Sequence, residues 1–209
     1  MCFSKEISLV TFIIGTIGSV LVYSLNTKID TIIAIFFFYI ILMQLIEYVL
    51  WNNLTCNITN KITTFVAIIL NSTMPIILAL LLLYNYNLPN QQNIIIFTVL
   101  FAIMMLIYNL QTKTLCTLKN KFNHLEWKWN NLFMYSIVYA IYIIYLSYVV
   151  LSIPFNWNKT LLFLLLSSYV FSIYVYWGTN NIASLWCFFG AFIPILWYSL
   201  KKIKYINYI

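Results

Sequence analysis

Charged side chains are scarce in this chain of 209 residues. Only 7% of the residues are charged, against roughly a quarter in soluble domains, and 64% are hydrophobic. The mean hydropathy is +0.93. Arginine is absent, so all eleven basic residues are lysines, and there are four acidic residues. This composition excludes an ordinary soluble domain and predicts a membrane protein.

Metal-ligating residues are equally few. The chain has one histidine, His124, and four cysteines without a C-x-x-C pair among them. A zinc site needs several converging ligands, so the sequence predicts no metal site and no cofactor. The net charge of +7 comes from lysines that flank apolar segments, where they would meet lipid headgroups. We therefore expect the lipid bilayer as a partner, and no nucleic acid.

Seven apolar segments reach or approach the length of about 20 residues that a membrane-spanning helix needs. The connections between them are short, and no soluble domain is visible. The sequence predicts an all-α fold, a polytopic seven-transmembrane-helix bundle forming a single transmembrane domain over residues 1–209. The predicted helices cover residues 7–25, 31–51, 62–84, 94–110, 129–151, 160–177 and 182–200.

Signature motifs of several membrane protein classes are missing. The last span has no lysine for a retinal Schiff base, and no arginine follows the third span as in G-protein-coupled receptors. No T-V-G-Y-G filter of a potassium channel occurs. A triad of Ser184, His124 and Glu47 could be written down, but no G-x-S-x-G elbow supports it. We therefore predict no catalytic residues, and a lipid enzyme is the least supported class.

The second span contains a carboxylate, Glu47, in the run I-I-L-M-Q-L-I-E-Y-V-L-W. A charge in hydrocarbon costs about 3 kcal/mol on insertion scales, so such a residue usually faces a partner or a water-filled cavity. Gln44 lies on the same helical face. Two interpretations stay open. Glu47 is either a protonated core carboxyl bonded to Gln44 or a tyrosine, or a cation ligand or proton carrier that faces a cavity.

Prolines interrupt the third and seventh spans. Pro75 cannot donate to the carbonyl of Asn71, and Pro194 cannot donate to that of Gly190. Irregular backbone at membrane depth is tolerated where it is buried in protein or lines a cavity. Pro75 and Pro194 are therefore hinge candidates, and the alternative is that both helices are simply kinked.

Alternating helix directions should bring polar groups together near the N-terminal side of the membrane. The second and sixth predicted helices end there, and the third, fifth and seventh begin there. His124 and Glu126 would share a face only if their segment were extended, and a solvated interfacial loop is the alternative. The predicted pocket for a solute or ion comprises Gln44, Glu47, Asn71, His124, Glu126, Trp127, Asn181, Ser184 and Trp186.

Orientation signals in the sequence conflict. Six lysines fall on the N-terminal side and five on the other, which the positive-inside rule cannot separate. A disulfide between Cys56 and Cys116, both on the N-terminal side, would require an oxidising compartment there. The lysine-rich segment 111–128 argues the other way, because it could bind anionic cytoplasmic lipid. We expect the N-terminus outside and the C-terminus in the cytosol.

Four short motifs carry a resemblance: L-M-Q-L-I-E-Y-V-L-W, N-S-T-M-P, H-L-E-W-K-W and S-L-W-C-F. They are similar to an uncharacterised family of small seven-helix membrane proteins from large DNA viruses and their protist hosts, over most of the chain. The resemblance implies no activity or substrate. The residues that it implies are important are Gln44, Glu47, His124, Glu126, Trp127, Trp186 and Cys187.

Three classes of function follow from these observations. The first is a channel or carrier for a small cation, proton or polar solute, with a pocket around Glu47. The alternative is a non-catalytic receptor-like or structural protein of a virion or organelle membrane. A membrane-embedded lipid enzyme is the third. Nothing in the sequence decides the oligomeric state.

Overall fold

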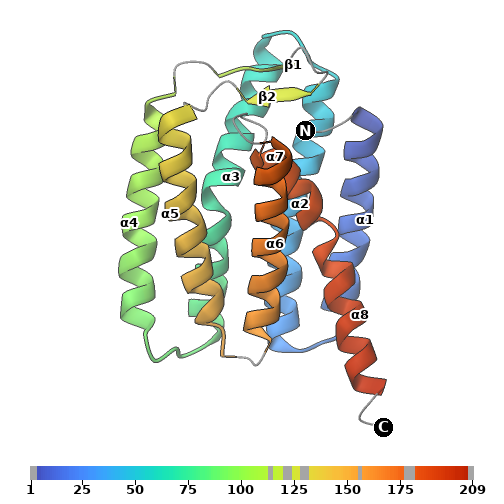
Figure 1. Cartoon of the computed structure of the whole chain (residues 1–209), viewed down its shortest axis with the longest axis vertical. Coiled ribbons are helices and arrows are strands. Elements are labelled where there is room, and N and C mark those ends of the chain that lie inside the picture. The colour runs from blue at the N-terminus through green and yellow to red at the C-terminus, as the bar shows by residue number, and fades with distance from the viewer. Residues whose placement is uncertain are drawn as a thin grey trace.

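The computed structural model describes residues 4–112, 115–119, 124–127, 132–154, 157–176 and 182–206. Within these ranges the chain forms a bundle of helices with a two-stranded antiparallel hairpin at one end (Figure 1). The elements are α1 (Lys5–Tyr23), α2 (Lys28–Trp51), α3 (Ile58–Asn85), α4 (Gln91–Leu110), β1 (Thr117–Lys119), β2 (Leu125–Trp127), α5 (Leu132–Leu151), α6 (Asn158–Tyr176), α7 (Ile182–Gly190) and α8 (Ile193–Ile206).

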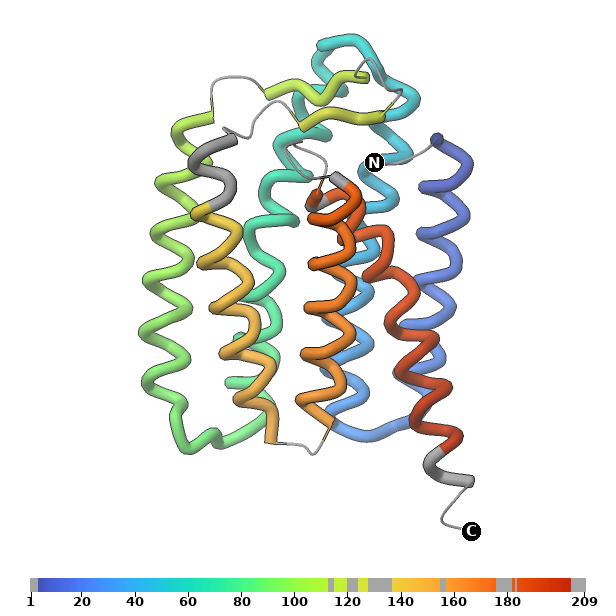
Figure 2. The backbone as a smooth tube through the Cα atoms, viewed as in Figure 1, coloured from blue at the N-terminus to red at the C-terminus, as the bar shows by residue number. Residues whose placement is uncertain are grey.

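The helical architecture agrees with the predicted all-α bundle. Among the described residues, six helical stretches are long and apolar enough to cross a membrane, and a shorter apolar helix covers Ile137–Leu151. The N-terminus lies at the hairpin end and the C-terminus at the other (Figures 1 and 2). Large apolar side chains such as Val10, Leu106 and Phe163 are more than half exposed on outward faces. This surface is compatible with surrounding lipid.

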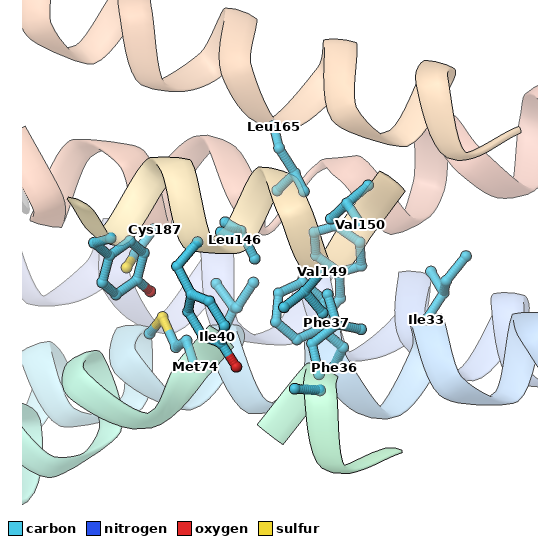
Figure 3. Packing of buried hydrophobic residues seen from close by; sticks show 14 of the residues in the cluster. Ile33, Phe36, Phe37, Ile40, Met74, Leu146, Val149, Val150, Leu165 and Cys187 are labelled. Atoms are coloured by element: carbon cyan, nitrogen blue, oxygen red, sulfur yellow. The ribbon is translucent and has the colours of Figure 1, made fainter. Parts of the chain in front are cut away.

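Apolar packing joins the helices from both halves of the chain. Figure 3 shows Phe36 and Phe37 of α2 close to Val149 of α5, with Leu165 of α6 on the other side of the cluster. All four side chains are buried. The core therefore lies along α2, which packs against α1, α3, α7 and α8.

The predicted seventh helix is divided in the structure. α7 ends at Gly190 and α8 begins at Ile193, with a turn between them. Pro194 lies in the first turn of α8, where a missing N–H is tolerated, so it helps to start a new helix. By contrast, α3 continues through Pro75 without a break.

Two glycines of α1 pack closely against α2 and the junction between α7 and α8. A Cβ added to Gly15 would lie 2.7 Å from the Ile41 side chain and 3.2 Å from Cβ of Ala191. A Cβ added to Gly18 would lie 2.8 Å from Cγ1 of Ile195. Small residues let helix backbones approach closely, so α1 packs tightly against α2 and the α7–α8 junction.

The hairpin, which the sequence did not predict, is held by a side chain of α3. The buried amide of Asn60 donates to the Thr117 carbonyl at 2.7 Å and accepts from the Thr117 N–H at 3.1 Å. Asn60 thus bonds β1 as a neighbouring strand would. Thr64 also donates to the Thr117 hydroxyl at 3.0 Å.

Two further contacts fasten the hairpin to the bundle. Cys56 and Cys116, the pair that the sequence analysis singled out, form a disulfide with their Cα atoms 5.6 Å apart. Leu125 of β2 packs against Leu50 at the end of α2, and both are fully buried. The hairpin therefore forms a fixed cap over this end of the helices.

The fit at Gly18 predicts a large effect of a small substitution. Gly18→Val should lower the free energy of unfolding by about 1–3 kcal/mol, because the added methyl groups overlap α8. Thermal unfolding in detergent micelles, followed by tryptophan fluorescence, measures the loss. Val20→Ile, on the exposed side of the same helix, is the matched control and should leave the midpoint unchanged. Equal midpoints for both variants would contradict the close packing.

Candidate functional site

Glu47 lies one turn before the end of α2, where α2 faces α7. Its side chain is fully buried, and its carboxylate accepts a hydrogen bond from the Ser184 hydroxyl. Gln44 is fully buried one turn earlier on the same helix. The structure therefore brings Glu47 and Ser184 together, 137 positions apart in the chain. Ser184 is thus a partner of this carboxyl other than the glutamine or tyrosine that the sequence analysis named.

A second group of buried polar side chains lies between α3 and α5 and includes Asn71, Tyr139 and Tyr142. The Asn71 amide donates to the hydroxyl of Tyr139 on α5, and the Tyr139 ring stacks on Tyr142 at 5.6 Å between centroids. The Asn71 Oδ1 atom and the Tyr142 hydroxyl are buried and have no hydrogen-bond partner among the described residues. Such atoms are the usual binding partners of internal water.

Trp186 extends this group across the bundle. Its indole N–H donates to the Leu165 carbonyl at 3.2 Å and to the Ser168 hydroxyl at 3.1 Å, both on α6. Its ring meets the Tyr142 ring edge-on at 5.8 Å. The neighbouring Cys187 is a buried free thiol in the same core. α7 therefore contributes three buried side chains to this region: Ser184, Trp186 and Cys187.

His124, Glu126 and Trp127 belong to the hairpin and not to a helix. In β2, Glu126 lies between the fully buried Leu125 and Trp127 and is itself only partly buried. His124 lies at a bend directly before this strand and is also partly buried. Burial lowers the pKa of His124, which favours the neutral imidazole. The remaining predicted pocket residue, Asn181, lies outside the described residues.

A second buried acid lies at the opposite end of α2. Asp30 is 1% exposed, and its carboxylate accepts from the indole N–H of Trp197 at 2.9 Å and pairs with the Lys201 ammonium at 3.2 Å. Thr27, the N-cap of α2, also donates to it. Sequence reasoning missed this site because T-K-I-D reads as an ordinary helix cap. The signal that could have found it is a lysine at the apolar end of the last span.

The surroundings of Asp30 are electrostatically coupled to the adjacent helix end. Tyr86 follows α3, and burial raises its pKa, with the Asp30 charge as a second cause. The Lys28 ammonium lies 4.9 Å from the Tyr86 ring centre. A cation over an aromatic face is attracted to it, so acid, lysines and aromatic rings cluster at this end of the bundle.

Comparisons of the chain with protein-family models, with curated proteins and with solved structures find no match. In the part of the chain that the structure describes, no group of three or more histidine, cysteine or acidic side chains could hold a metal ion. The two buried acids of α2, Asp30 and Glu47, are therefore the strongest functional candidates in this part of the chain.

A double-mutant cycle tests the Asp30–Lys201 pair. Asp30→Asn or Lys201→Met alone should lower the free energy of unfolding by about 3 kcal/mol, because each removes one charge of an ion pair whose acid is fully buried. The double variant should lose clearly less than the sum of both. Lys202→Met, at an exposed neighbouring position, is the control. Strictly additive losses in detergent unfolding would show that the pair does not interact.

Proposed function

We propose that the chain is a multi-pass integral membrane protein that carries protons or small cations by moving α7, the first half of its divided last span, against α2. One observation carries this proposal: the two buried carboxylates of α2 hold different halves of that span. Glu47 bonds Ser184 of α7, and Asp30 bonds Lys201 of α8, on either side of the break. Discontinuous helices recur at the ion and substrate sites of transporters.

The protonation of Glu47 would drive the motion. A charge in an apolar core is costly, so the closed arrangement, with Glu47 fully buried, favours the neutral carboxyl. Loss of the proton favours an arrangement in which water or a cation reaches the carboxylate. The other titratable groups on neighbouring elements of this core include Cys187 of α7 and Tyr139 and Tyr142 of α5.

The two halves of the divided span, α7 and α8, are attached to the bundle by different contacts. This difference supports motion of one half relative to the other. α8 is anchored by an ion pair and an indole hydrogen bond to Asp30. α7 has nine residues and, in the described part of the chain, is held without an ion pair, by hydrogen bonds from Ser184 to α2 and from Trp186 to α6. We therefore assign the moving part to α7, while α8 stays on α2. The Asn71 Oδ1 atom and the Tyr142 hydroxyl, which have no hydrogen-bond partner in the described part of the chain, provide polar atoms for water or a cation along the path.

A non-catalytic structural or receptor-like role in a virion or organelle membrane is the second candidate. The full burial of Glu47 and the disulfide-fastened hairpin favour it, because both suit a closed, static bundle. The resemblance to seven-helix proteins of large DNA viruses and protists fits either role. We propose no enzymatic activity.

Proton flux into liposomes tests the carrier directly. Under an imposed membrane potential, vesicles with the wild-type chain should acidify faster than empty vesicles. Glu47→Gln, which keeps the volume but cannot ionise, should abolish the difference. Glu6→Gln, at an exposed carboxylate, is the matched control and should behave as wild type. Runs with sodium and potassium gradients separate proton from cation transport.

Flux equal to that of empty vesicles under every gradient would reject the carrier function and favour the structural or receptor-like role. Flux that is unaffected by Glu47→Gln would place the path elsewhere in the bundle.

We further propose that the hairpin end faces the outside or a lumen, since a disulfide persists in an oxidising compartment. An impermeant reductant followed by an impermeant maleimide should label Cys56 and Cys116 in sealed, right-side-out vesicles. A cysteine introduced as Lys202→Cys, at the other end, should react only after permeabilisation. The reverse pattern of labelling would refute this orientation.

A further inference from the structure

A groove runs along the outer side of the seam between α4 and α5. Two adjoining cavities of about 360 and 290 Å³ share Leu100 and Met104, so they form one groove. Along α4 it extends from Phe97 to Gln111, about 21 Å at 1.5 Å per helical residue. The residues that α5 contributes are Val138, Ile141, Ile144, Tyr145 and Tyr148.

The floor of the groove is apolar at Phe101 and Tyr145, and the hydroxyl groups there are bonded inside the protein. Phe101 and Tyr145 stack across it with 4.5 Å between ring centroids. The Tyr145 hydroxyl is bonded to the Thr98 hydroxyl at 2.6 Å, and Thr98 lies 2.6 Å from the Ile94 carbonyl oxygen. Because these polar atoms are satisfied within the protein, the groove suits a hydrocarbon ligand and not a polar one.

The rims of the groove favour a thin occupant over a helix. Phe97, Leu100, Ile141 and Ile144 are between 41% and 68% exposed and stand along both sides. Transmembrane helices associate through small residues that let backbones approach closely. A helix about 10 Å wide would rest on these large side chains and leave the floor uncovered. A single hydrocarbon chain can enter between them.

We infer that the α4–α5 groove binds one acyl chain of a membrane phospholipid, with the headgroup at the Gln111 end. Gln111 is exposed directly after α4, at the hairpin end of the bundle (Figure 1). The groove length exceeds the depth of one leaflet, which is about half of a 30 Å hydrocarbon core. The inference rests on the proposed placement in a bilayer but not on proton transport.

Photo-crosslinking in reconstituted vesicles tests the groove. The probe is phosphatidylcholine with a diazirine in one acyl chain, and the adducts are mapped by mass spectrometry after digestion. Adducts on the lining residues of α4 and α5 should exceed those at Ile13 of α1 and Phe163 of α6 several-fold. Leu100→Trp and Ile144→Trp, which fill the groove, should remove this excess. Ile96→Trp, exposed on α4 but outside the lining, should preserve it.

Two results would overturn the inference. Equal adduct yields on α1, α4, α5 and α6 would mean that the groove meets only bulk lipid. Oxidative disulfide crosslinking of two copies that carry Ile144→Cys would make a second copy the occupant. Proton flux measured in the same vesicles separates the acyl-chain site from proton transport. Uniform labelling together with intact, Glu47-dependent flux would reject the acyl-chain site alone.

Discussion

Neither buried carboxylate of α2 can lie in an apolar core without a partner, and this constraint sets the arrangement of the helices around α2. Glu47 accepts a hydrogen bond from the Ser184 hydroxyl, which holds the start of the last span against the end of α2. Asp30 takes Lys201 and Trp197, which draws the end of that span against the start of α2. Both contacts require the two segments to run antiparallel, and α1 then closes over their junction through Gly15 and Gly18.

The six long apolar helices could be predicted from the sequence because membrane thickness imposes a length and a composition that are visible locally. The division of the last span could not. It depends on the fit between α1 and the turn before Pro194, which are far apart in the chain. The hairpin was missed for a similar reason: its strands have three residues each, and Asn60, 57 positions away, completes the hydrogen bonding of β1.

The sequence predicted several residues of the candidate site, but not which of them bond to each other. Alternation of helix direction was enough to put Glu47 and Ser184 at one level, yet the bond between them needs the rotation of each helix about its axis. Asp30 was overlooked because a carboxylate in the first turn of a helix commonly serves the helix itself. Its second role, as partner of Lys201, appears only once the two ends of the chain are seen together.

If α7 moves as proposed, water should reach it when Glu47 ionises. Cys187, a buried thiol on α7, reports on this if Cys2 is replaced by serine. The measurement is the rate at which a small methanethiosulfonate modifies Cys187 in vesicles as the pH rises, compared between wild type and Glu47→Gln. The comparison removes the intrinsic pH dependence of the thiol. A much steeper rise in the wild type is the predicted result, and identical profiles, or no reaction at any pH, would contradict the account.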